Sequence, residues 1–218
     1  MQRRFQPGDD DAPARATDRG LLLERVAAGL AHEGKNPLHN MVLHLQLMAE
    51  KLTSAGVPVT KHVTALRDGI GKVDALLKSF GEFASPEQLP PDLGAAVHRA
   101  ARLFAYDARR ASVAITCTSP ESAGVRSTGK WLGDLVAHAL VAGVELARDG
   151  GEVAMEVVQQ SNSSTLTVRA QGGIGNRDAA VVHLDAARRL SAGAACELSI
   201  ETPPGGVARL SLHFLHPR

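Results

Sequence analysis

The 218-residue sequence lacks most of the features that reveal a function from composition alone. Its two cysteines, Cys117 and Cys196, lie far apart and form neither a disulfide framework nor a metal-binding spacing. The formal net charge of +1 gives no indication of a partner, and the sequence has neither a basic cluster dense enough for nucleic-acid binding nor an acidic tail. No apolar run approaches the roughly 20 residues of a membrane span, and the polar N-terminus is not a signal peptide. We therefore expect a reduced, cytoplasmic protein with no nucleic-acid or membrane partner.

Aromatic residues are also scarce, at 3% of the chain, whereas hydrophobic residues make up 44%. This is enough apolar side chain for a real core, which must be built mainly from alanine, leucine and valine. The length suits one ordinary domain, or a helical module followed by a small second domain.

The first part of the chain predicts a tail followed by two long helices. Residues 1–19 have no apolar period and are expected to form a disordered tail. Residues 20–84 carry apolar side chains at spacings of three, four and seven, with a turn near Gly56 and Pro58. The apolar positions are Ala27, Leu30, Gly34, Leu38, Met41, Leu45, Met48 and Leu52, and then Val63, Leu66, Ile70, Val73, Leu77, Phe80 and Ala84. We predict an antiparallel helical hairpin, and a homodimer in which two hairpins form a four-helix bundle.

A proline-rich linker, residues 85–91, separates this hairpin from a region with a different pattern. Residues 92–218 alternate between helical and strand periodicities. Helices are expected at 92–108, 130–146 and 183–192, and strands at 112–118, 152–159, 165–170, 196–201 and 207–214. The predicted fold class is therefore α+β, a helical hairpin followed by a two-layer α/β sandwich.

The most unusual stretch lies inside the first predicted helix, where His32, Glu33, Asn36 and Pro37 fall close together. The heptad pattern turns His32 away from the seam, so its imidazole should be exposed and nucleophilic near neutral pH. Glu33 can hold the far ring nitrogen or accept a proton, and Asn36, one turn on, can orient a water. Pro37 lacks an N–H and should loosen or kink the helix at this turn.

Residues 28–38 resemble the H-box of bacterial sensor histidine kinases, and the hairpin around them resembles the dimerisation and histidine-phosphotransfer domain of that family. The resemblance implies that His32 accepts a phosphoryl group and that Glu33 assists its transfer. It also implies that Asn36 lies where the family uses an amide or hydroxyl for phosphatase activity. The sequence departs from the family at Gly34, where a larger apolar residue is usual.

Residues 92–218 resemble the ATP-binding domain of the same family in length and in order of elements, but the nucleotide motifs are eroded. Asp134 and His138 stand where the family has two asparagines, the second of which holds Mg²⁺. Two such side chains one turn apart can in principle ligate a metal, but we expect an ordinary surface pair.

The next motif should place an aspartate against the adenine amino group, followed by two glycines. Gly173 and Gly175 remain, but Gln171 stands at the aspartate position. Residues 176–182 contain no glycine and are too short for the phosphate-binding lid of the family. We therefore predict that ATP and Mg²⁺ binding are lost, that the protein has no cofactor, and that its glycine cluster is an ordinary turn.

These observations favour a histidine phosphotransferase of a phosphorelay, which carries a phosphoryl group between the aspartates of two response-regulator receiver domains through His32. It needs no ATP, and the receiver carries its own Mg²⁺. Lys35 and His39, on or near the His32 face, are candidates to contact the receiver. Two alternatives remain open, namely a divergent ATP-dependent sensor histidine kinase and a non-catalytic pseudokinase scaffold that binds a response regulator.

Overall fold

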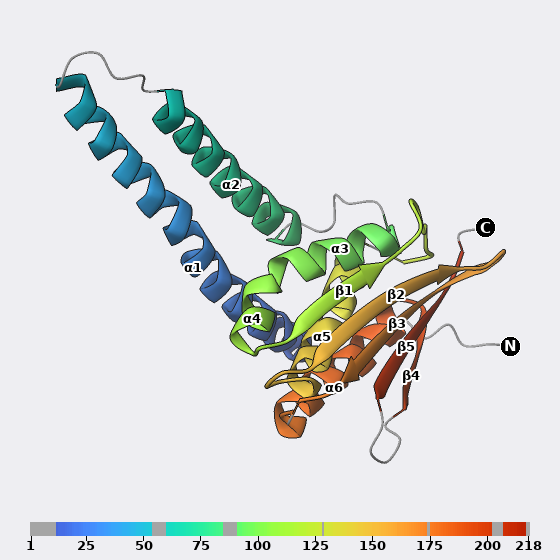
Figure 1. Ribbon diagram of the computed structural model, residues 1–218. Helices are drawn as coiled ribbons and strands as arrows, with labels where there is room; N and C mark the ends of the chain where they lie inside the picture. The colour runs from blue at the N-terminus through green and yellow to red at the C-terminus, as the bar shows by residue number, and fades with distance from the viewer. Residues whose placement is uncertain are drawn as a thin grey trace, which may run out of the picture.

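The computed structural model describes residues 12–53, 60–84, 91–127, 129–173, 175–201 and 207–216. It contains a helical hairpin followed by an α/β sandwich, which confirms the predicted fold class (Figure 1). The helices are α1 (Ala12–Thr53), α2 (Thr60–Ala84), α3 (Leu93–Leu103), α4 (Ala105–Arg110), α5 (Gly129–Leu146) and α6 (Arg177–Gly193). The strands are β1 (Ala114–Thr118), β2 (Glu152–Gln159), β3 (Ser163–Gln171), β4 (Cys196–Glu201) and β5 (Ala208–Leu215).

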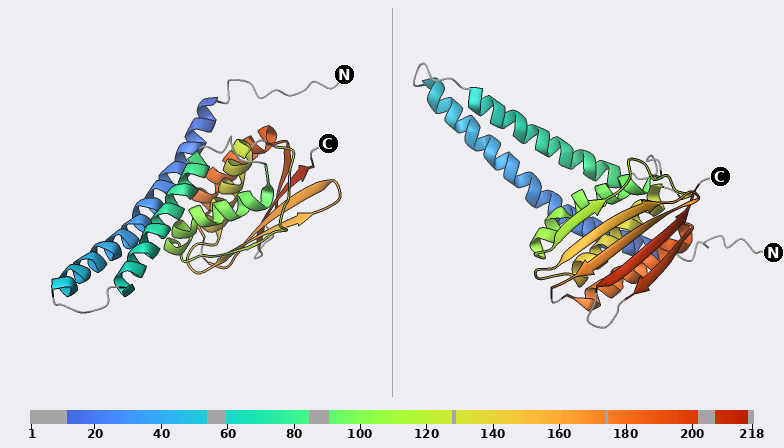
Figure 2. Two further views of the ribbon diagram at one scale, coloured as in Figure 1. Left: turned by 90° about the horizontal axis from the view of Figure 1, so that it is seen from above. Right: turned by 45° about the vertical axis from the view of Figure 1, so that its right-hand side comes forward.

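The five strands form one sheet in the order β1-β2-β3-β5-β4, in which only the β1–β2 pair is parallel. Helices cover one face of this sheet and leave the other face open (Figure 2). Buried side chains alternate along the central strands, as expected for a sheet with one covered face. The covered face carries Val153, Met155, Val157, Leu166, Val168, Leu210, Leu212 and Phe214.

The hairpin of α1 and α2 extends away from the sandwich (Figures 1 and 2). α1 runs as a single helix through Pro37. The two helices approach closely at Gly69, where an added Cβ would lie 2.6 Å from the Cγ atom of Met41. Nearer the tip, the Nδ1 atoms of His44 and His62 lie 3.0 Å apart across the two helices.

The prediction of a disordered tail over residues 1–19 is wrong for residues 12–19, which are helical. These residues dock on the sandwich, and Asp18, Leu22 and Val26 are buried at every fourth position. The sequence does not show this period as an apolar pattern, because Asp18, one of the buried residues, is charged. The predictions for residues 1–11, the turn at 54–59 and the linker at 85–90 fall outside the described residues.

Two other boundaries differ from the prediction. The helix expected over residues 92–108 is broken at the buried Phe104, so that α4 is a separate helix of six residues. α6 begins at Arg177, before the predicted start, because the side chain of Asn176 caps it by accepting a hydrogen bond from the Ala179 N–H at 3.1 Å. The segment where the family has its lid is therefore the first turns of a helix.

Candidate functional site

His32 lies on α1 where that helix leaves the sandwich and continues into the hairpin. Its side chain is 55% exposed, which confirms the prediction that the imidazole is accessible. Exposure is needed for any reaction with a protein partner, because the partner must bring its own reacting group to a ring nitrogen.

One face of the His32 imidazole is covered by Tyr106 of α4. The two ring centroids are 4.5 Å apart, and the ring planes differ by 29°, so the rings are stacked. Tyr106 is the only tyrosine of the chain. The sequence did not identify it, because no local pattern connects residue 106 to residue 32.

Glu33 does not hydrogen-bond to His32. Its Oε1 atom is 3.9 Å from the Nδ1 atom of His32, which exceeds hydrogen-bonding distance. The same oxygen instead pairs with Arg109 of α4 at 2.7 Å. Because Nδ1 is the ring nitrogen on the side of Glu33, Nε2 is the nitrogen left for attack on an incoming group.

Asn36 is exposed and lies on the rim of a cavity of about 740 Å³ between the hairpin and the helices α3 and α4. Glu33, Tyr106 and Arg109 line the same cavity, together with charged residues of α2 such as Asp68. The structure thus brings two of the predicted site residues, Glu33 and Asn36, to one hollow beside His32.

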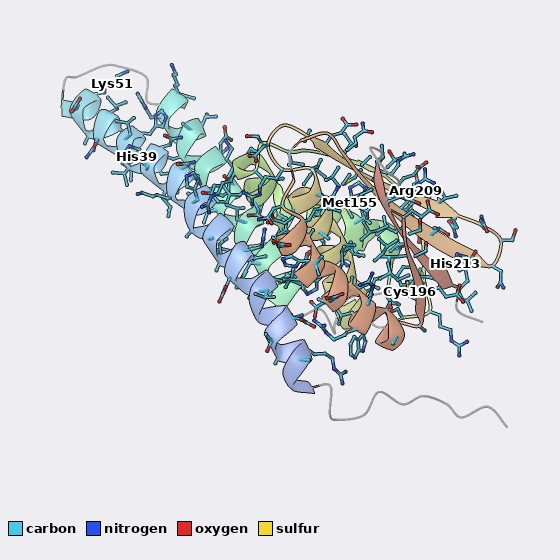
Figure 3. The ribbon with its side chains drawn as sticks, turned by 90° about the horizontal axis from the view of Figure 1, so that it is seen from below. His39, Lys51, Met155, Cys196, Arg209 and His213 are labelled. Atoms are coloured by element: carbon cyan, nitrogen blue, oxygen red, sulfur yellow. The ribbon has the colours of Figure 1, made fainter. Side chains whose placement is uncertain are left out.

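Lys35 and His39 do not line this cavity. Both are exposed and line a second groove of about 610 Å³ along the hairpin, whose other residues are mostly apolar and include Leu38 and Leu77. His32 is not among the residues that line this groove. Figure 3 places His39 toward the outer end of α1, far from the labelled residues of the sheet.

The positions of the first nucleotide motif are not on the surface, so the prediction of a surface pair is wrong. Asp134 is buried and accepts hydrogen bonds from Arg19 of α1 at 2.5 and 2.7 Å. His138 is fully buried and contacts His183 of α6, with 2.9 Å between the two Nδ1 atoms. The docking of α1 on α5 and α6 encloses these side chains, which local sequence patterns do not reveal.

Burial keeps both histidines neutral. It lowers the pKa of His138 to about 3 and that of His183 to about 4. His183 and Arg189 lower the pKa of His138 further, and Arg25 does the same for His183. A 2.9 Å contact between two neutral rings requires that one Nδ1 donates and the other accepts. The pair is therefore part of the packing between α5 and α6.

Further ion pairs fasten the first half of α1 to the sandwich. Arg25 bridges Asp107 of α4 at 2.5 Å and Glu145 of α5 at 2.6 Å, and Asp18 pairs with Arg189 of α6 at 2.6 Å. Burial opposes ionisation of Glu145, yet hydrogen bonds from arginines hold the pKa of its carboxyl below the usual value. Side chains of α1 thus contact the same helix face that carries the eroded first motif.

The glycine cluster after β3 is a turn packed on the end of α5. Gly173 and Gly175 have φ angles of +70° and +71°, and a Cβ at Gly173 would collide with the carbonyl oxygens of Ala147 and Arg148. The Gly175 N–H donates to the Arg148 carbonyl. Gln171, at the adenine position, donates its side-chain N–H to Glu152.

Two further findings concern metal binding and membrane spans over all the described residues. Across the part of the chain that the structure describes, no three histidine, cysteine, aspartate or glutamate side chains converge in a way that could hold a metal ion. Nor is any described helix both long and apolar enough to cross a membrane.

No protein-family model matches the sequence, and no curated protein does. Solved structures do match. The chain is similar in structure to histidine kinase cores. The histidine kinase AdeS of Acinetobacter baumannii is 14% identical with a TM-score of 0.49, and the match covers 86% of this chain and 98% of that one. A bacterial phosphotransferase is 16% identical with a TM-score of 0.48, covering 88% of this chain and 95% of that one. At these values the function must be argued from the residues around His32.

Proposed function

We propose that this chain is a histidine phosphotransferase, which relays a phosphoryl group between receiver-domain aspartates through His32 without using ATP. The observation that carries the proposal is the contrast between one site on α1 and another on α5. His32 of α1 is exposed and set beside a carboxylate and an amide, whereas Asp134 and His138 of α5, at the nucleotide-motif positions, are packed against other side chains of the chain.

The geometry at His32 suits attack on an acyl phosphate. The lone pair of Nε2 forms the new N–P bond, the P–O bond to the receiver aspartate breaks, and that carboxylate leaves with the electron pair. The proton stays on Nδ1, and Glu33, 3.9 Å away on that side of the ring, offsets the positive charge that the ring gains as the N–P bond forms. Transfer to a second receiver reverses these steps, and the receiver supplies the Mg²⁺ that neutralises the phosphoryl oxygens.

The loss of ATP use is supported by what occupies the family's nucleotide positions. Arg19 satisfies Asp134, His183 contacts His138, and the amide of Gly175 is already bonded to a backbone carbonyl. A nucleotide would have to displace these contacts to reach either motif.

The homodimer is supported by the apolar side chains that the hairpin leaves uncovered. Leu38 and Leu45 of α1 are 50% and 54% exposed, and Ile70 and Leu77 of α2 are 61% and 56% exposed. These residues belong to the predicted seam, and so large an apolar surface is typical of an interface. A second copy, with the same stripe, would cover it as a four-helix bundle. Lys35 and His39 border this surface and remain candidates to contact a receiver.

The test is phosphotransfer from isolated receiver domains that have been phosphorylated in advance. We expect an acid-labile, base-stable label on the wild-type chain and none on His32→Ala, a loss of at least about a hundredfold. His98→Ala, which removes another exposed histidine, is the matched control and should label normally. A label that survives in His32→Ala contradicts the proposal. A wild-type chain that binds a phosphorylated receiver but never accepts its phosphoryl group would favour the scaffold function.

Calorimetry with Mg²⁺ and ATP separates the proposal from the divergent kinase. We expect no binding heat at millimolar nucleotide and no label on His32 from radioactive ATP. Saturable binding together with ATP-dependent labelling would make the chain a kinase.

A further inference from the structure

We infer that Tyr106 and Arg109, on α4 of the sandwich domain, are positioning residues that hold His32 and Glu33 ready for phosphoryl transfer. The inference rests on the proposed function for the identity of the natural phosphoryl donor. It assigns to the sandwich a part in the reaction, because α4 belongs to that domain and not to the hairpin.

Tyr106 is placed to limit the rotation of the imidazole. Its ring stacks on one face of His32, yet the His32 side chain remains 55% exposed, so the stacking does not close off the imidazole from a partner. α4 packs directly on α1 at this turn, since a Cβ added at Gly29 would lie in van der Waals contact with the Cβ of Tyr106 at 3.4 Å. A stacked ring keeps the nucleophile in one orientation and so lowers the entropy lost on reaction.

Arg109 is placed to control the carboxylate of Glu33. Glu33 of α1 and Tyr106 of α4 lie against the His32 ring, and Arg109 of α4 pairs with Glu33. While Arg109 holds Glu33, the carboxylate stays 3.9 Å from Nδ1. Without Arg109, the carboxylate would be free to pair with a protonated imidazole, which has no lone pair for attack.

α4 itself is fixed in place, as a positioning element must be. Asp107, between the two proposed residues, binds Arg25 of α1 at 2.5 Å, and Ala108 is buried in the core. The same arginine reaches Glu145 of α5. The ion pairs that fasten α1 to the sandwich therefore also set the position of Tyr106 and Arg109 against His32.

The test uses phosphoramidate, a small phosphoryl donor that needs no receiver. The imidazole displaces ammonia from phosphorus, so the N–P bond to the amine breaks as the N–P bond to His32 forms. The rate of phosphohistidine formation on the full chain is followed by ³¹P NMR. We expect Tyr106→Ala to slow the rate by about two- to tenfold, the rate equivalent of one aromatic pair, and Tyr106→Phe to restore most of that loss.

Arg109→Ala should move the midpoint of the pH–rate profile upward, because the freed Glu33 favours the protonated ring. Arg109→Lys should restore most of the original profile. Arg110→Ala is the matched control, since Arg110 is exposed on the same helix and does not line the cavity beside His32. Circular dichroism spectra and unfolding curves of each variant verify that it folds.

An unchanged rate in Tyr106→Ala, or an equal loss in Tyr106→Phe, would overturn the assignment of Tyr106. An unmoved pH profile in Arg109→Ala would overturn that of Arg109. These results are distinguishable from failure of the proposed function. If phosphoramidate labels His32 with the expected variant pattern but no phosphorylated receiver does, the proposed relay fails and the positioning residues stand.

Discussion

The two halves of α1 are one continuous helix with opposite surroundings. The first half, up to about residue 29, is held against α4, α5 and α6 by ion pairs and by the buried side chains of Leu22 and Val26. The second half, from His32 onward, contacts mainly α2 and carries the exposed side chains of Leu38, Val42, Leu43 and Leu45. The difference shows how one helix can do two things, because its first half packs on the sandwich and pairs with the buried Asp134 of α5, whereas its second half leaves the side chain of His32 exposed.

The strongest expected effect concerns the two buried histidines of α5 and α6, on which the first half of α1 is docked. The folded chain keeps His138 and His183 neutral down to about pH 4, whereas the unfolded chain protonates them below about pH 6.5. Lowered pKa values of this kind give stability that is complete above about pH 6.5 and declines as the pH falls toward the folded values. We expect a loss of roughly 2–4 kcal/mol between about pH 7.5 and pH 5, measured by urea unfolding.

The double variant His138→Leu, His183→Leu is the control for this effect. It removes both titrating rings from the contact between α5 and α6, so its stability should depend much less on pH in this range. An equally steep decline in the double variant would show that other groups control acid unfolding.

The second prediction concerns the open half. Leu38→Glu should raise the dimer dissociation constant by at least about a hundredfold, because it places a charge in an apolar interface. Sedimentation velocity over a range of concentrations measures this. Val181→Glu is the matched control, since Val181 is 49% exposed and Leu38 is 50% exposed, but Val181 lies on α6. A wild-type chain that sediments as a monomer would contradict the bundle.

The third prediction tests the turn after β3 as a structural element. Gly173→Ala should destabilise the chain by roughly 2–3 kcal/mol, because the residue has φ near +70° and the new Cβ would meet backbone oxygens. Gly133→Ala, in α5 with nothing within 4 Å of an added Cβ, should be neutral or stabilising. Equal unfolding midpoints for the two variants would contradict the tight packing of the turn.

The smallest expected effect tests whether the first half of α1 is helical. Gly20→Ala adds a methyl group where nothing lies within 4 Å, so it should stabilise the chain by about 0.5–1 kcal/mol through helix propensity. Thermal unfolding measures the change. If alanine at this position leaves the midpoint unmoved, the segment around residue 20 is not helical in solution and the comparison between the two halves fails.

The elements that the sequence predicted well are those whose signal is local. The strands β2, β4 and β5 and the helix α5 lie within about one residue of their expected bounds, because alternating burial or a long apolar run marks them directly. The exposure of His32 was also predicted correctly, because its position in the heptad turns it away from the apolar seam. The start of α6 was missed because its N-cap, Asn176, stands among residues expected to form a loop.

The sequence by itself determined the exposure of His32, the two helical stripes and the strand pattern, since each depends on residues within a few positions of one another. Only the tertiary structure decided which side chains surround them. Tyr106 stacks on His32 and Arg109 pairs with Glu33, although each pair is separated by more than seventy positions in the sequence. Arg19 and Asp134 pair across 115 positions, and this contact buries a site that local reasoning put on the surface. Stacking, ion pairing and burial arise from contacts across the fold, so no periodicity of the chain records them.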